Sequence, residues 1–97
     1  MATYIALLNW TDEGARNLKD APERRRRVQA LAEQCGCQIT ANYLTMGPYD
    51  RVAIMEAPDD AAMARFALGF GMLGFARTTT MRAFDREEAQ PLLDSVS

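Results

Sequence analysis

Aromatic and polar residues on predicted strands and at their ends carry the side chains best suited to binding a small molecule. Tyrosine and tryptophan rings supply apolar walls, and arginines supply charge-assisted hydrogen bonds to an anionic or enolic ligand. Asp50 could act as a general base, although holding turn amides or pairing with an arginine is the favoured interpretation. The candidate ligand-binding residues are Asn9, Trp10, Tyr43, Tyr49, Asp50, Arg77 and Arg82.

The sequence contains no histidine, which excludes several catalytic mechanisms. Ser–His and Cys–His nucleophile activation, imidazole metal ligation and a proton shuttle near neutral pH are all removed. In cofactor-free chemistry the proton acceptor would therefore be Asp50, Tyr43 or Tyr49 with a shifted pKa. No catalytic residue is assigned from these patterns, and we expect no cofactor.

Cys35 and Cys37 are separated by a single glycine, Gly36. A disulfide across so short a ring would be strained. A metal site would need further ligands, and the chain has no other cysteine and no histidine. We therefore expect a reduced pair and no bound metal.

Two motifs look like recognition signatures, but their context favours structural roles. The segment Gly69-Phe-Gly-Met-Leu-Gly74 fits G-x-G-x-x-G, yet it lies late in a predicted helix and precedes a strand. A dinucleotide fingerprint instead follows a strand and opens a helix. The run Arg24 to Arg27 also forms no flat patch, because successive helical residues point about 100° apart. We predict close helix packing or an irregular helix end for the glycines, and a solvated helix face or subunit salt bridges for the arginines.

The composition is that of one small globular domain. The chain has 97 residues, 48% of them hydrophobic and 25% charged, which predicts one domain over 1–97 with a core of 1–84 and a tail of 85–97. A net charge of -2 gives no general attraction for nucleic acid or an anionic membrane, so neither is an expected partner. No apolar run approaches the roughly 18 residues of a membrane span, and we expect a cytoplasmic protein.

Hydrophobic periodicity predicts a β-α-β-β-α-β order. Strands are expected over 3–10, 38–46, 50–57 and 75–84, and helices over 12–36 with a break near Pro22, over 59–73 and over a short terminal 85–93. Gly47 to Asp50 predicts a hairpin turn. This order is typical of an α+β ferredoxin-like fold with a four-stranded antiparallel sheet. The predicted core is Ile5, Leu7, Leu8, Leu18, Val28, Leu31, Ile39, Val52, Ile54, Phe66, Phe70, Leu73 and Met81.

The topology suggests where the candidate residues meet. The first and third strands are central and antiparallel, so Trp10 and Asp50 should lie side by side, with Tyr49 closing over them and Arg77 at the same end. A shift of register by one residue would exchange the side chains on the two faces. Two helices cover one face only, and the other face is also apolar. We therefore expect a homodimer or a ring of dimers through that face.

Several segments in the right order resemble a known family. They are Met1-Ala-Thr-Tyr-Ile, Leu8-Asn-Trp-Thr-Asp, Tyr43-Leu-Thr-Met-Gly-Pro-Tyr-Asp, Glu56-Ala-Pro-Asp-Asp and Arg77-Thr-Thr-Thr-Met-Arg-Ala-Phe. Together they resemble the GYD family of small bacterial proteins, from the N-terminus to about Phe84, with Pro48 between the Gly and Tyr of the name-giving motif. The resemblance implies a dimeric α+β barrel, in which two ferredoxin-like sheets close face to face around a small cavity, and it implies no particular reaction.

Three functions follow as hypotheses. The first is a small-molecule-binding or regulatory module in a homo-oligomeric barrel, because apolar walls with a few polar groups suit a ligand site. The second is a cofactor-independent enzyme of the oxygenase or isomerase type, which related barrels include. The third is a purely structural or adaptor subunit.

Overall fold

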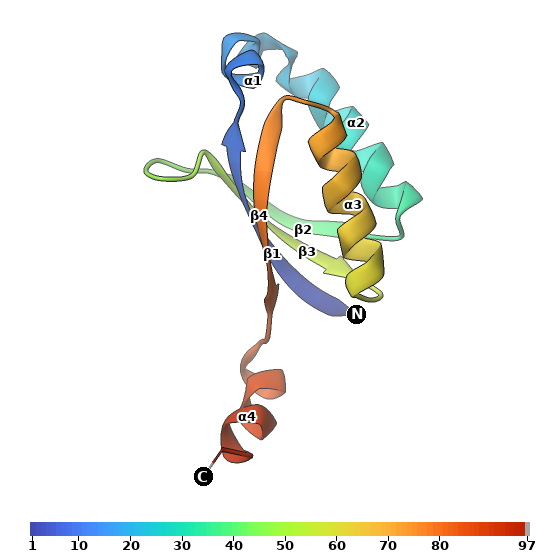
Figure 1. Cartoon of the computed structure of the whole chain (residues 1–97), viewed down its shortest axis with the longest axis vertical. Coiled ribbons are helices and arrows are strands. Elements are labelled where there is room, and N and C mark those ends of the chain that lie inside the picture. The colour runs from blue at the N-terminus through green and yellow to red at the C-terminus, as the bar shows by residue number, and fades with distance from the viewer. Residues whose placement is uncertain (97) are drawn as a thin grey trace.

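A four-stranded antiparallel sheet organises the molecule, whose computed structural model describes residues 1–96 (Figure 1). The strands are β1 (Ala2–Trp10), β2 (Gln38–Leu44), β3 (Arg51–Ala57) and β4 (Ala76–Ala83), in the spatial order β2-β3-β1-β4. Both neighbours of β1 run antiparallel to it. The ferredoxin-like fold predicted from the sequence is confirmed, with β1 and β3 as the central strands.

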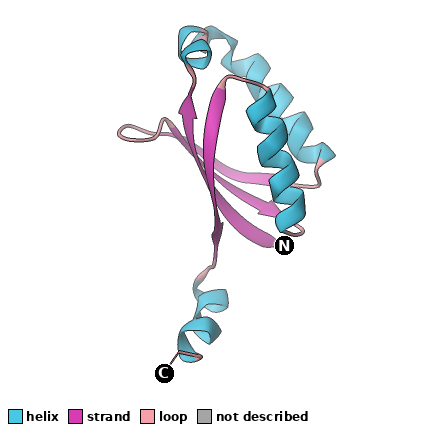
Figure 2. Cartoon of the chain, viewed as in Figure 1, coloured by secondary structure: helices cyan, strands magenta, loops and turns pink. Residues whose placement is uncertain are grey.

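The helices lie mainly on one side of this sheet (Figure 2). They are α1 (Asp12–Arg16), α2 (Ala21–Gln34), α3 (Asp60–Met72) and α4 (Arg86–Asp94), with a 3-10 turn, η1 (Leu18–Asp20), before α2. The helix expected over 12–36 is therefore interrupted at Asn17–Asp20. Pro22 lies in the first turn of α2, where its missing amide hydrogen costs no helical bond.

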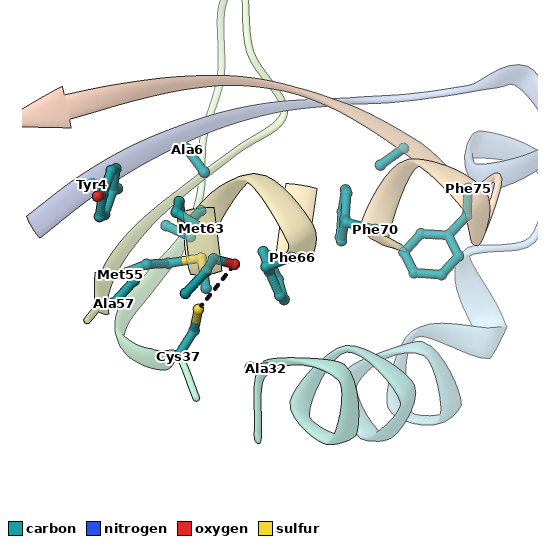
Figure 3. Close-up of a cluster of buried hydrophobic side chains, with 13 residues drawn as sticks. Tyr4, Ala6, Ala32, Cys37, Met55, Ala57, Met63, Phe66, Phe70 and Phe75 are labelled. Atoms are coloured by element: carbon teal, nitrogen blue, oxygen red, sulfur yellow. Dashed lines mark hydrogen bonds between the residues drawn. The ribbon is translucent and has the colours of Figure 1, made fainter. Parts of the chain in front are cut away.

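The core lies between the sheet and α3, with Ala32 and Cys37 closing its lower side (Figure 3). Phe70 packs edge-to-face on Phe75, with ring centroids 5.7 Å apart. The buried residues are Tyr4, Ala6, Ala32, Cys37, Ala53, Met55, Ala57, Ala62, Met63, Phe66, Phe70, Phe75 and Ala76. Alanines on three strands leave room for the larger helix side chains to approach the sheet.

Among the strand residues of the predicted core, Leu8 and Ile39 pack against the core, but the prediction was wrong for Ile5, Leu7, Val52, Ile54 and Met81, which lie on the face that the helices leave uncovered. Tyr4 and Ala6 face the helices, so Ile5 and Leu7, which alternate with them, point to the other side. Leu18, also predicted as core, is 47% exposed; it lies in the 3-10 turn η1 and lines the cavity described below. We call the uncovered side the open sheet face; its apolar residues, paired across strands, are Ile5, Leu7, Val52, Ile54 and Met81.

Glycines in and near α1 and α3 allow close packing. A Cβ on Gly14 would lie 1.9 Å from the Phe75 carbonyl oxygen, and one on Gly69 would lie 2.9 Å from Leu31 Cδ1. Gly74 adopts a φ of 84°, a left-handed conformation that glycine favours, in the connection between α3 and β4. The G-x-G-x-x-G segment therefore serves helix packing and a helix end, as predicted.

The terminal helix α4 projects away from the body of the molecule (Figure 1). Asp85 and Glu88 form a capping box at its start. Glu88 also accepts a hydrogen bond from Arg82 of β4 at 3.2 Å, which ties α4 to the end of the sheet. None of the helices within residues 1–96 has the length and apolar character needed to cross a membrane.

Candidate functional site

A cavity of about 500 Å³ lies between the helix-facing side of the sheet and helices α2 and α3. Helix α2 contacts α3 and β2, and its residues Arg24, Arg25, Val28 and Gln29 form one wall of the cavity. The inner walls are apolar side chains that are buried or half-buried. They are Ala6, Leu8, Trp10, Val28, Ile39, Ala53, Met55, Met63, Phe66, Phe70, Phe75 and Ala76.

The outer walls of the cavity are polar. We define the polar rim as Arg25 and Gln29 from α2, Asn42 from β2 and Arg51 from β3; Arg51 is half-buried and the others are exposed. Arg51 donates to the Asn42 side-chain oxygen Oδ1 from Nε at 3.2 Å and from Nη2 at 3.0 Å. This pair fixes the Arg51 guanidinium at the rim while leaving its remaining N–H groups for another acceptor.

A β-bulge in β2 brings Asn42 to the rim. The register shifts between Ile39 and Ala41, so that Asn42 pairs with Ala53 on the helix-facing side. A regular strand would alternate, and Ile39 and Asn42 would then lie on opposite faces. The bulge places both on the same face, where both line the cavity.

The arginine run divides between two roles. Arg24 lines the cavity, donates to the Gly14 carbonyl oxygen at 3.0 Å and stacks over the Phe75 ring at 5.1 Å. Arg25 also lines the cavity, whereas Arg26 points outward and pairs with Glu23 at 2.5 Å. The predicted solvated face holds for Arg26, but it was wrong for Arg24, because one side of α2 faces the cavity.

The charges at the cavity are of one sign. Arg24, Arg25 and Arg51 line it, and no aspartate or glutamate among the described residues does. The same walls carry no tyrosine hydroxyl or cysteine thiol within residues 1–96. The arrangement thus offers hydrogen-bond donors and positive charge, and it lacks a side chain that could accept a proton from a bound molecule.

Asp50 and Trp10 lie side by side, as the topology predicted. The Asp50 Oδ2 atom accepts a hydrogen bond from the Trp10 backbone amide at 2.9 Å, and the Asp50 amide donates to the Leu8 carbonyl oxygen at 2.8 Å. The Asp50 carboxylate therefore holds the end of β1. The Trp10 side chain lines the cavity, and Asp50 itself does not.

The other candidate residues are not gathered with Trp10. Asn9 pairs with Arg77 at the same end, as expected, but on the open sheet face. Tyr43 is 59% exposed on that face, opposite Val52. The Tyr49 carbonyl oxygen accepts a hydrogen bond from the hydroxyl of Thr45 at 2.7 Å within the hairpin.

Arg82 lies at the far end of the sheet, opposite Tyr4. Its guanidinium stacks over the Phe84 ring at 4.3 Å and over the Tyr4 ring at 5.7 Å. The Tyr4 hydroxyl donates to the Asp60 carboxylate. Burial, followed by the Asp60 hydrogen bond, raises the pKa of Tyr4 to about 12. This cluster is separate from the cavity and joins β1, β4 and the start of α3.

Cys37 is buried beneath α3, with its thiol donating to the Ala62 carbonyl oxygen at 3.7 Å (Figure 3). Burial is the main cause that raises the pKa of this thiol. The thiol is therefore a packed core group, held in its neutral form.

Sequence reasoning missed Arg25, Asn42 and Arg51 as site residues. Arg51 carried a usable signal, because it alternates with Ala53 and Met55 and so shares their face. Asn42 carried none, since the bulge that turns it is not marked by a glycine or a proline. The cavity was expected between two sheets of a dimer, whereas the cavity found lies within one chain on the opposite side of the sheet.

Comparison with known proteins finds a matching family model and a named relative. Residues 4–93 match the family model of the GYD domain. A protein of Thermus thermophilus, named glutamine synthetase and cystathionine beta-lyase binding protein, is 40% identical over 84 residues, which cover 86% of this chain and 88% of that protein.

Two solved structures share the architecture. The protein FFRP-DM1 has a TM-score of 0.60 at 20% identity, covering 87% of this chain and 100% of that one, which shows similarity of fold alone. The protein TTHA0845 from Thermus thermophilus has a TM-score of 0.53 at 27% identity, covering 87% of this chain and 94% of that one.

Proposed function

This chain belongs to the GYD domain family, and on that premise we propose that it is a regulatory module that binds a small organic molecule. The observation that carries the proposal is the cavity beneath α2. At about 500 Å³ it lies within the range of natural ligand sites, which span roughly 300 to 1,000 Å³. Its apolar walls and few polar groups are the usual composition of such a site.

Binding is better supported than catalysis at this cavity. The proton acceptors considered from the sequence were Asp50, Tyr43 and Tyr49, and none of them lines it. Asp50 is engaged by the Trp10 amide, and Tyr43 lies on the open sheet face. A cofactor-independent enzyme would need another proton acceptor at the bound molecule. We therefore rank the enzyme below the binding module.

A homodimer through the open sheet face is part of the proposal. Ile5 pairs with Ile54 on β3 and with Met81 on β4, which forms a continuous apolar strip across three strands. Met81 is 42% exposed in the single chain. Contiguous apolar surface of this kind is rare on monomers. A second copy packed on this face would leave the cavity open to ligand on its other side.

An adaptor role is the second candidate, and the relative's name favours it. That protein is named for binding two enzymes and is 40% identical to this chain over most of both lengths. We infer that this chain also docks on a protein partner, with the cavity ligand regulating the complex. Size-exclusion chromatography of the chain mixed with purified glutamine synthetase or cystathionine beta-lyase tests this: co-elution supports docking, and separate elution of both enzymes contradicts this choice of partner.

Thermal unfolding against a panel of metabolites tests the proposed ligand site. A ligand at 100 times its dissociation constant stabilises the folded state by about 2.7 kcal/mol. For a domain of this size this raises Tm by roughly 10 °C or more. Stabilisation by one chemical group of compounds supports the binding module, whereas no stabilisation by any compound contradicts it and favours the purely structural role.

A further inference from the structure

We propose that the cavity selects a small organic anion, with its negative head at the polar rim and its apolar body inside. This inference rests on the proposed function, because it assigns a chemical class to the ligand of that same site. It follows from three observations: the sign of the charges around the cavity, the gradient of burial along its walls, and the way Arg51 is held.

The sign of the charge comes first. Arg24, Arg25 and Arg51 line the cavity, and among residues 1–96 no acidic side chain lines it. The chain as a whole carries a net charge of -2, so this positive region is a local feature and not a reflection of composition. A positive cleft with apolar walls attracts an anion and disfavours a cation.

The burial gradient gives the orientation. Met55, Met63, Phe66 and Phe70 line the inner end and are each less than 5% exposed. The rim residues Arg25, Gln29 and Asn42 are exposed. An amphipathic ligand would therefore leave its charged head near water and the arginines while its apolar part replaces water at the inner walls.

Arg51 is the residue best placed to fix the head group. Two of its N–H groups bind Asn42 Oδ1, which sets the plane of the guanidinium without neutralising its charge. Within residues 1–96 it forms no ion pair with a carboxylate. Its remaining N–H groups match the planar oxygens of a carboxylate. Arg25 would add a second positive charge from the helix wall.

Arg24 has a different role. It is held by the Gly14 carbonyl oxygen and by the Phe75 ring, so its guanidinium braces the junction of α1, α2 and the start of β4. We therefore exclude it as a test position, because its loss would disturb packing as well as charge.

Isothermal titration calorimetry with matched probes tests the inference. Hexanoate and 3-phenylpropanoate are compared with hexanamide, 3-phenylpropanamide and hexylammonium, which keep the apolar body and change the charge. We expect each carboxylate to bind at least about tenfold more tightly than its amide, the difference typical of charge-assisted hydrogen bonds. Hexylammonium should bind more weakly than either.

Neighbouring arginines supply the matched control. Arg51→Gln and Arg25→Gln should each weaken carboxylate binding by about five- to tenfold and leave amide binding unchanged. Arg26→Gln removes the same charge from the same helix, but Arg26 does not line the cavity. The Arg26→Gln variant should therefore bind the carboxylates as tightly as the wild type does.

The outcomes separate this inference from the proposed function. Amides or hexylammonium that bind as tightly as the carboxylates would overturn the anion assignment, as would an equal loss in Arg26→Gln and Arg51→Gln. If neither carboxylate binds while another compound of the metabolite panel stabilises the fold, the inference fails and the binding module stands. If no compound of either set binds, both fail.

Discussion

The Asp50 carboxylate accepts a hydrogen bond from the Trp10 backbone amide at 2.9 Å, and this bond joins the residue before β3 to the end of β1. Asp50 therefore acts in the fold, and Trp10 is the member of this pair whose side chain reaches the cavity. The hydrogen bond thus distinguishes Asp50, which stabilises the fold, from Trp10, which lines the candidate site.

Asp50→Ala removes the acceptor of the Trp10 amide. We expect it to lower the free energy of unfolding by roughly 1 to 3 kcal/mol, because a partly buried donor loses its partner. Asp50→Asn keeps an oxygen at that position and should cost less. Chemical denaturation measures both. Unchanged stability in Asp50→Ala would show that the hydrogen bond contributes nothing.

Gly14→Ala tests the close approach of α1 to Phe75. The new Cβ would meet the Phe75 carbonyl oxygen at 1.9 Å; because that oxygen belongs to the backbone and a Cβ has no rotational freedom, the main chain must move. We expect a loss of about 1 to 3 kcal/mol or more. Gly71→Ala is the control, since nothing lies within 4 Å of its Cβ and alanine favours the helix by up to about 1 kcal/mol. Equal effects of the two substitutions would contradict this packing.

The raised pKa of Tyr4 predicts that the folded state loses stability at alkaline pH. Its pKa is raised to about 12 from the ordinary 10.0, first by burial and then by the Asp60 hydrogen bond. The folded state therefore keeps the phenol proton more tightly than the unfolded state does. The stabilisation is fully present below pH 10 and is lost as the pH rises towards 12.

Tyr4→Phe should flatten that loss between pH 10 and 12, as measured by denaturation at each pH. Tyr43→Phe is the control, because Tyr43 is 59% exposed and its substitution should leave the wild-type profile. A profile of Tyr4→Phe that still falls as the wild type does over this range would assign the loss to other groups.

The proposed dimer should be disrupted by a charged side chain placed on the open sheet face. Ile54→Lys places a charge in the middle of the apolar strip and should convert the dimer to a monomer in sedimentation velocity. Circular dichroism should show an intact fold, because Ile54 lies outside the core beneath the helices. Ala64→Lys, on the exposed side of α3, should remain dimeric. A wild-type monomer at micromolar concentration would contradict the dimer itself.

Strand and helix order were predictable because turn and cap residues mark the boundaries. Asp59 caps α3 through the Ala62 amide at 2.8 Å, and Gly36 adopts a φ of 73° after α2. These are local interactions that the residue type encodes. Pairing of Trp10 with Asp50 followed from topology alone, since two central antiparallel strands must bring those ends together.

The face of the sheet on which each side chain lies was less predictable. Both faces of β1 are apolar, so hydrophobicity favours Ile5 and Leu7 for the core as much as Tyr4 and Ala6. The choice depends on how helices pack on a sheet rich in alanine, which is a tertiary property. Asn42 depends further on a bulge. The cavity residues on α2, chiefly Arg25, could not be predicted, because their role depends on how that helix is placed over the sheet.

Trp10 fluorescence tests the central claim most directly, because Trp10 is the single tryptophan of the chain and its side chain lines the cavity. Titration with 3-phenylpropanoate should change its emission in a saturable way, 3-phenylpropanamide should require about tenfold higher concentration, and Arg51→Gln should lose this preference. Equal responses to the two compounds would contradict the anion site. An emission that neither compound changes at millimolar concentration would also contradict the anion site, and the binding module would then depend on the result of the metabolite panel.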